Sequence, residues 1–350
     1  MADLDRLPAA ANRHAVGLLR FPDPRTDWVI VTVAHLARPT TPDAVTERLD
    51  ALHGVVPVVG ARLRDETWHP GAPPTVEVVD GEPVEHRGFD RAFDLAAEAP
   101  LRLLLGAGGT RLAVLGHHAA FDGLSLAAVA GALLGGPLPR PVDSPPPGEP
   151  GSKLALLARL ARPAQRVTPT IGVWPTDAYA AVEVHLDGPG VTARIAEACA
   201  GAARAHNLRH GTRLDRIGIT VAVGGPAGVG NVASYRRVDV ATTGPVADAV
   251  RDALADPAEP GEQVSAPRWL MRALQPLVER FSDSILVSNL GRLDLPGATR
   301  FDFYPVARGR SAVCFAAATV VGGASTLSLR ARDLSPGDAR RLLHDAAARL

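Results

Sequence analysis

The stretch 112–123 reads LAVLGHHAAFDG, an apolar run that ends in two adjacent histidines and then an Asp-Gly pair. The run 111–115 predicts a strand, which forms a hairpin with a strand at 101–105 through the glycine-rich turn between them. Asp122 is a favoured N-cap residue, and the apolar residues after it predict a helix that ends at Leu134. Both histidines therefore lie at a corner between a strand and a helix.

The two histidines admit three interpretations. Adjacent strand residues point to opposite faces, so only one of His117 and His118 can face a given cleft. Because no H-x-x-E or C-x-x-C follows to complete a ligand set, we expect no metal site. A single histidine here would usually be a core residue that hydrogen-bonds a backbone carbonyl. Two histidines followed by Asp122 and Gly123 favour a general base at a cleft, with Asp122 as a cap or ion-pair partner.

The rest of the chain alternates predicted strands and helices. A strand is expected at 28–36, and residues 135–150 have the proline- and glycine-rich composition of a linker. We therefore predict a first lobe at 1–150, a linker at 151–170 and a second lobe at 171–350. The second lobe has expected strands at 180–186, 217–223, 235–240, 285–287, 312–320 and 326–332, and expected helices at 191–205, 245–254, 269–281 and 336–350.

Composition argues against several functions. The 350 residues carry 37 basic and 37 acidic side chains, and this zero net charge gives no attraction for nucleic acid or an anionic membrane. Cys199 and Cys314 are too few for a disulfide framework, so a reducing compartment is the default. Residues 1–13 lack the apolar core of a secretory signal, and no apolar run reaches the ~18 residues of a membrane span. We therefore expect a cytoplasmic protein.

The order H-H-x-x-x-D-G after an apolar strand resembles the signature of nonribosomal-peptide condensation domains and related CoA-dependent acyltransferases. That superfamily includes polyketide-associated acyltransferases and, more distantly, chloramphenicol acetyltransferase. The SNLGR stretch at 288–292 resembles the free-standing acyltransferase branch. Further weak similarities follow in the family's order, namely GARLR at 60–64, FDLA at 93–96, APLR at 99–102, GN at 230–231 and LSLR at 327–330.

The resemblance implies roles for the motif residues. His118 would be the general base, which takes the proton from an acceptor amine or hydroxyl as that group attacks an acyl thioester. His117, Asp122 and Gly123 would complete the catalytic segment, with glycine allowing close approach of the backbone at the corner.

The same resemblance implies roles for two further pairs of residues. Asp122 would be structural and salt-bridged to an arginine, for which Arg292 and Arg64 are the candidates. Ser288 and Asn289 would lie near the lobe interface, on the acceptor side, where a polar group can stabilise the oxyanion. A polar turn after a buried strand is the other interpretation of this pair.

The fold that the resemblance implies is α/β, with two chloramphenicol-acetyltransferase-like lobes in a V-shaped unit and a tunnel between them. Each lobe would be a mixed sheet with helices. The donor would be acyl-CoA or an acyl or peptidyl carrier protein, whose phosphopantetheine arm bears the thioester. The acceptor would be a small molecule, and no permanently bound cofactor is implied. The expected activity is ester or amide formation in natural-product biosynthesis.

One departure from the family leaves alternatives open. The family has an additional helix-bearing stretch before the strand that begins here near Ile217, so the second lobe is expected to be shortened. A trimmed lobe is compatible with a non-catalytic domain that recruits a carrier protein or a tailoring enzyme. Epimerisation or cyclisation is a third possibility, although cyclisation relatives replace the histidines by aspartate.

Overall fold

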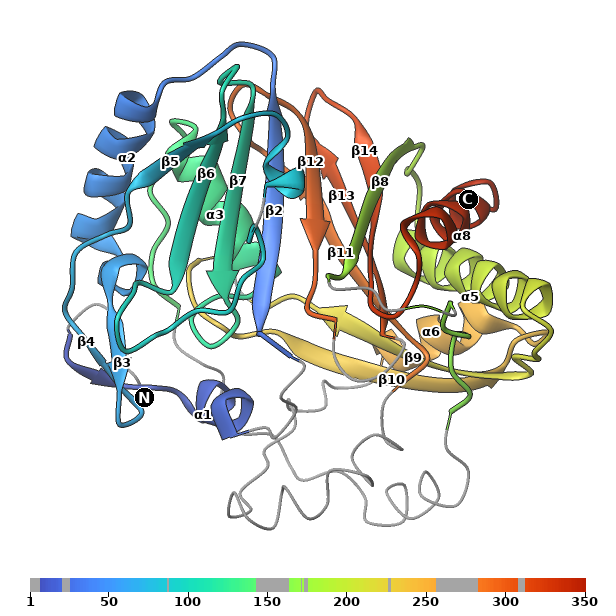
Figure 1. Cartoon of the computed structure of the whole chain (residues 1–350). Coiled ribbons are helices and arrows are strands. Elements are labelled where there is room, and N and C mark those ends of the chain that lie inside the picture. The colour runs from blue at the N-terminus through green and yellow to red at the C-terminus, as the bar shows by residue number, and fades with distance from the viewer. Residues whose placement is uncertain are drawn as a thin grey trace.

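The computed structural model describes residues 7–20, 26–86, 88–142, 164–170, 172, 176–225, 228–255, 283–307 and 312–350. The predicted helix 269–281 and most of the predicted linker 151–170 lie outside these residues. Two mixed sheets, each with helices on one face, form two lobes (Figure 1). The predicted α/β fold of two lobes, each a mixed sheet with helices, is therefore confirmed.

The first lobe is built on a five-stranded sheet in the order β12-β2-β7-β6-β5. The hairpin predicted from residues 101–115 is present as β6 and β7, and only β5 pairs in parallel, with β6. A three-stranded sheet, β1-β4-β3, lies beside it. The elements of this lobe are β1 (Ala9–Ala10), α1 (Arg13–Arg20), β2 (Val29–Leu36), α2 (Pro42–Val55), β3 (Arg62–Arg64), β4 (Thr67–His69), β5 (Val76–Val79), β6 (Leu101–Gly106), β7 (Arg111–His117) and α3 (Gly123–Leu133).

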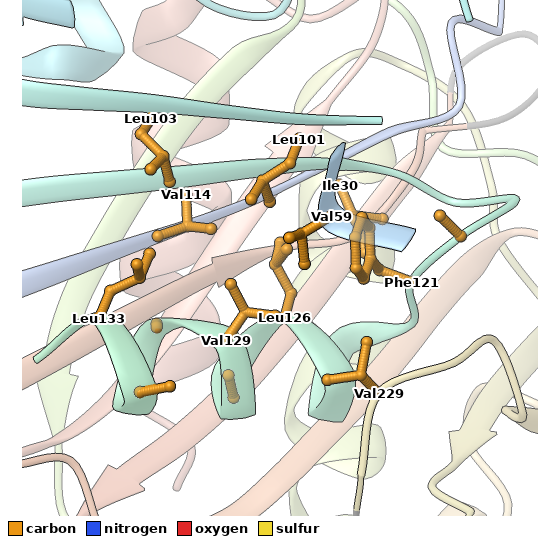
Figure 2. Close-up of a cluster of buried hydrophobic side chains, with 14 of the residues drawn as sticks. Ile30, Val59, Leu101, Leu103, Val114, Phe121, Leu126, Val129, Leu133 and Val229 are labelled. Atoms are coloured by element: carbon orange, nitrogen blue, oxygen red, sulfur yellow. The ribbon is translucent and has the colours of Figure 1, made fainter. Parts of the chain in front are cut away.

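The core of the first lobe lies between its sheet and α3 (Figure 2). Apolar residues recur at helical spacing along α3, and their side chains point to the sheet. Burying each such leucine or valine stabilises the fold by about 1.5–3 kcal/mol. The residues of this cluster labelled in Figure 2 include Ile30, Leu101, Leu103 and Val114 on the strands, with Phe121, Leu126, Val129 and Leu133 in and just before α3. This packing holds the first turn of α3, and with it the corner at His118, in one position.

The second lobe is built on a six-stranded sheet in the order β10-β9-β11-β13-β14-β8. Helices α5, α6 and α8 pack on one face of it through a separate apolar core. The elements are β8 (Ala178–Val184), α5 (Val191–Arg209), β9 (Arg216–Val223), β10 (Ser234–Ala241), α6 (Val246–Ala255), β11 (Ile285–Leu293), β13 (Val313–Val320), β14 (Ser325–Ala331) and α8 (Pro336–Ala347). No helix in the described part of the chain is long and apolar enough to cross a bilayer.

One strand crosses between the lobes and corrects the predicted boundary. β12 (Ala298–Tyr304) pairs antiparallel with β2, so a segment assigned to the second lobe completes the sheet of the first. The hydroxyl of Thr326, on β14, donates to the Phe301 carbonyl at 2.6 Å and helps to hold β12 in place. Assigning all of 171–350 to one lobe was wrong, because a non-local strand pairing leaves no local pattern.

A buried arginine also joins the lobes. Arg330 on β14 is 1% exposed, and its Nη1 donates to the Val29 carbonyl on β2 at 2.6 Å. Its Nε donates to Asp177 at 2.8 Å, and Arg332 holds the other oxygen of that carboxylate at 3.0 Å. Since Val29 begins the strand next to β7, this contact fixes the second sheet close to the histidine corner.

Candidate active site

His118 follows the last residue of β7 and is held through both its backbone and its ring. Its N–H donates to the Trp28 carbonyl at 2.7 Å, and its Nδ1 lies 2.8 Å from the Phe121 carbonyl. A carbonyl can only accept, so Nδ1 carries a proton, and in the neutral form of the ring the lone pair lies at Nε2. The Tyr235 hydroxyl, from β10 of the second lobe, lies 3.3 Å from Nε2. The ring is therefore oriented in one tautomer, as a general base requires.

His117 lies on the other face of the strand, as predicted. Its ring packs perpendicular to Phe93 with centroids 6.0 Å apart, and its Nδ1 accepts from the Ala119 N–H at 3.1 Å. Burial, with a smaller contribution from His118, lowers the pKa of His117 from 6.5 to about 3. His117 is thus a neutral structural residue that shapes the corner.

The depressed pKa of His117 predicts a pH dependence of stability. Between about pH 6 and 4 the unfolded chain binds a proton at this residue and the folded chain does not, so stability falls as the pH falls. The free energy of unfolding of His117→Gln should therefore depend less steeply on pH than that of the wild type, by up to about 1.4 kcal/mol per pH unit. Urea unfolding of both proteins across this range measures it, and parallel pH profiles would contradict the assignment.

Asp122 caps α3 and ties the corner to the second lobe. Its Oδ1 accepts from the Ser125 N–H at 2.8 Å, and its Oδ2 accepts from the Val232 N–H at 3.1 Å. The predicted salt bridge is wrong: the buried carboxylate is occupied by these donors, whereas Arg292 and Arg64 are exposed. Asp122 has the predicted structural role, but its partners are backbone N–H groups and not an arginine.

Asp122→Ala is expected to lower the free energy of unfolding by about 2–4 kcal/mol. The change removes a cap and leaves the buried N–H groups of Ser125 and Val232 without acceptors. Thr41→Ala is the matched control, because Thr41 caps the exposed start of α2 and should cost only about 1 kcal/mol. Equal losses in urea unfolding would show that Asp122 is no more than an ordinary cap.

Gly123 allows a close contact at the same corner, as predicted. A Cβ at this position would lie 2.7 Å from Phe303 on β12 and 2.9 Å from Leu290 on β11. Both distances are shorter than van der Waals contact, so a larger residue would force α3 and these two side chains apart. The glycine therefore lets the helix that carries the corner pack directly on β11 and β12.

The loop of residues 228–232 from the second half closes over the corner. Asn231 is 2% exposed, and its Nδ2 donates to the carbonyl of His118. The Ser125 hydroxyl accepts from the Gly230 N–H at 3.0 Å and contacts the Gly230 carbonyl. The Gly-Asn pair was noted in the sequence only as a weak similarity, and the structure brings it into contact with the histidine.

Ser288 and Asn289 point to opposite faces of β11. Asn289 donates to Thr192 of α5 at 3.0 Å and accepts from the Gly291 N–H, on the side away from His118. Placing Asn289 on the acceptor side was therefore wrong, because neighbouring strand residues alternate between faces. Ser288 is buried on the other face, and it aligns with Tyr235 through Ala222 on the strand between them.

Solved structures provide the comparison. The chain is similar to the epimerization domain from the third module of tyrocidine synthetase B, with a TM-score of 0.61 and 13% identity over 99% of this chain and 96% of that one. A starter condensation domain of rhizomide synthetase gives 0.60 and 11% over 97% and 93%, and the condensation domain of Monacolin K polyketide synthase gives 0.55 and 14% over 98% and 96%. The chain has the fold of a condensation domain. No protein-family model and no curated protein matches it.

Within this condensation-domain fold, Tyr235 is the functional candidate that the sequence did not reveal. It lies on β10, 117 positions from His118, and reaches the ring only because the two lobes pack together. A tyrosine within an alternating strand has no local signal that separates it from a core or surface residue. The neighbours of Tyr235 in the same row across the sheet are Ala222 and Ser288. Both side chains are small, so no bulky side chain of this row lies next to the phenol.

Proposed function

We propose that this chain is an acyltransferase that moves an acyl group from a thioester donor to an amine or hydroxyl acceptor, with His118 as the general base. The observation that carries the proposal is the ring of His118. Its Nδ1–H is held by the Phe121 carbonyl, so the Nε2 lone pair points toward the second lobe. A base in a fixed tautomer between two lobes is what deprotonation of a bound acceptor needs.

The proposed reaction has two steps and needs no redox partner. Nε2 of His118 takes the proton of the acceptor N–H or O–H while the acceptor forms a bond to the thioester carbonyl carbon. The C–S bond of the tetrahedral intermediate then breaks, and the leaving thiolate takes the proton from the imidazolium. The products are an amide or ester and a thiol, and the base returns to its starting state.

Ser288 is the proposed donor to the oxyanion of the intermediate. It lies on the face of the second sheet that carries Tyr235, one strand beyond Ala222. Successive strands lie about 4.8 Å apart, so Ser288 is about 10 Å from Tyr235 along the sheet. The thioester carbonyl would have to lie within about 3 Å of the Ser288 hydroxyl for this serine to stabilise the oxyanion.

The proposed donor is a phosphopantetheine thioester, either acyl-CoA or an acyl or peptidyl carrier protein. Support comes from the rhizomide synthetase starter condensation domain of the same fold, whose structure contains C8-CoA and Leu-SNAC. The proposed acceptor is a small molecule, and the proposed setting is natural-product biosynthesis.

A donor comparison tests the function. The protein is incubated with one acyl chain presented either as acyl-CoA or on a carrier protein, with a panel of amines and alcohols. We expect an acylated acceptor, detected by mass spectrometry, from at least one donor. If neither thioester is consumed while a carrier protein binds tightly, the chain is a non-catalytic recruiting domain and the proposal is wrong.

Tyr235→Phe is expected to lower kcat by about 3- to 10-fold, because the Nε2 of His118 loses one neutral hydrogen bond. The ring stays in place, so the melting temperature should change little. Tyr304→Phe is a suitable control, because Tyr304 is buried and packs against Tyr179 with centroids 5.2 Å apart, away from the His118 ring. Equal kcat values for wild type and Tyr235→Phe would show that the Tyr235 hydroxyl does not take part in the reaction.

A further inference from the structure

A second group of histidines lies on the helical side of the second lobe, away from His118. His206, near the end of α5, and His210, one turn later, approach Asp338 in the first turn of α8. Figure 1 shows α5 and α8 side by side on the outer face of the sheet. One ligand atom from each of the three residues lies within 4.8 Å of the others, the only such group in the described residues.

His206 offers a buried lone pair. Its Nε2 lies 2.8 Å from the Thr168 carbonyl, so Nε2 carries the proton and Nδ1 is an acceptor. Nδ1 has no hydrogen-bond partner although the residue is fully buried, and an unsatisfied buried acceptor is unfavourable.

His210 and Asp338 complete a set of three donors. His210 Nε2 lies 3.5 Å from Asp338 Oδ1, and both side chains are partly exposed. The Asp338 Oδ2 accepts from the hydroxyls of Thr170 at 2.7 Å and Ser335 at 2.9 Å, which fixes the carboxylate and leaves Oδ1 toward the histidines. The rings of His206 and His210 lie 4.4 Å apart, one helical turn from each other.

We propose that His206 Nδ1, His210 Nε2 and Asp338 Oδ1 bind a divalent transition-metal cation of the zinc class. Two imidazoles and one carboxylate are a common zinc ligand set, and the hydrogen bond from His206 Nε2 to the Thr168 carbonyl fixes the orientation of the ring, as is usual for a histidine that binds zinc. Metal–ligand bonds of about 2.0–2.2 Å require the atoms to close by about 1 Å, which the exposed His210 side chain can supply.

This site is independent of the proposed acyl transfer. The expectation of no metal rested on residues near His118, whereas this group joins residues 206, 210 and 338, which only the tertiary fold brings together. A cation here would cross-link the end of α5 to the start of α8 and to the segment that contains Thr168. Binding of the cation is expected to change stability and not acyl transfer, because α5 and α8 pack on the face of the second sheet opposite the histidine corner.

Zinc titration of untagged, chelator-treated protein tests the site. Isothermal calorimetry should show one zinc ion per chain, and zinc should raise the melting temperature. Co²⁺ in the same site should give the visible absorption of tetrahedral coordination. His210→Ala and Asp338→Asn should each weaken zinc binding by at least about tenfold. His210 is exposed, so its variant should melt like the wild type when chelator is present.

His185→Ala is the matched control. His185 is 3.0 Å from Asp187 in an exposed pair that belongs to no three-residue ligand group among the described residues, so removing it should leave zinc affinity and stoichiometry unchanged. If wild type and His210→Ala bind zinc equally, or if Co²⁺ gives the same spectrum with both, the three residues form only an ion-paired cluster and the proposal fails.

Discussion

Replacing His118 by alanine is expected to lower kcat for acyl transfer by about 10²–10⁴-fold, the range that a positioned general base contributes. The loss follows from geometry, because the ring is held with Nε2 3.3 Å from the Tyr235 hydroxyl of the second lobe. A tyrosine hydroxyl is a much weaker base than an imidazole at neutral pH, so it cannot replace the ring. The measurement is the rate of acylated-acceptor formation at saturating donor and acceptor.

His35→Ala controls for the general effect of removing a histidine. His35 lies at the far end of β2, bound to Asp302 at 2.9 Å, and should retain wild-type kcat. The His118→Ala protein should melt within several degrees of the wild type, because the side-chain contacts it loses, to the Phe121 carbonyl and the Tyr235 hydroxyl, contribute about 1 kcal/mol each. A folded His118→Ala protein with wild-type kcat would exclude His118 as the base.

Arg330→Ala is expected to lower the free energy of unfolding by about 3 kcal/mol or more. Removing one partner of a buried ion pair leaves the other charge uncompensated, and the Val29 carbonyl also loses its donor. Arg332 still holds one oxygen of Asp177, so we expect the lower end of the usual range. Urea unfolding measures the effect.

The control for Arg330 is an exposed pair of similar length. Arg216 lies 2.8 Å from Asp239 at the surface, and Arg216→Ala should cost less than about 1 kcal/mol. If the two alanine variants unfold at the same urea concentration, the inter-lobe contact of Arg330 contributes little and the lobes are held by other contacts.

Local sequence patterns correctly predicted most of the strands and helices near the site. The apolar run before His117, the glycine-rich turn and the N-cap Asp122 predicted β6, β7 and α3, and all three are present. The alternation rule also separated His117 from His118 correctly. These features depend on residues within a few positions of one another, which is the range over which sequence patterns carry information.

The errors arose where distant segments meet. β12 joins β2 across more than 260 positions, and Tyr235 reaches His118 from another lobe. The partner of Asp122 proved to be the backbone of Val232, which no side-chain pattern can indicate. Asn289 is a different case, because the alternation rule applied to β11 would have placed it opposite Ser288. The predicted tunnel and the shortening of the second lobe stay predictions.

Release of free thiol from an acyl thioester tests the central claim most directly. Thiol is followed by a colorimetric reagent, with and without acceptor, for wild type and His118→Ala under the same conditions. Acyl transfer through His118 predicts acceptor-dependent release by the wild type that exceeds release by the variant by about 100-fold or more. Equal release by the two proteins, or release that does not depend on acceptor, would contradict it.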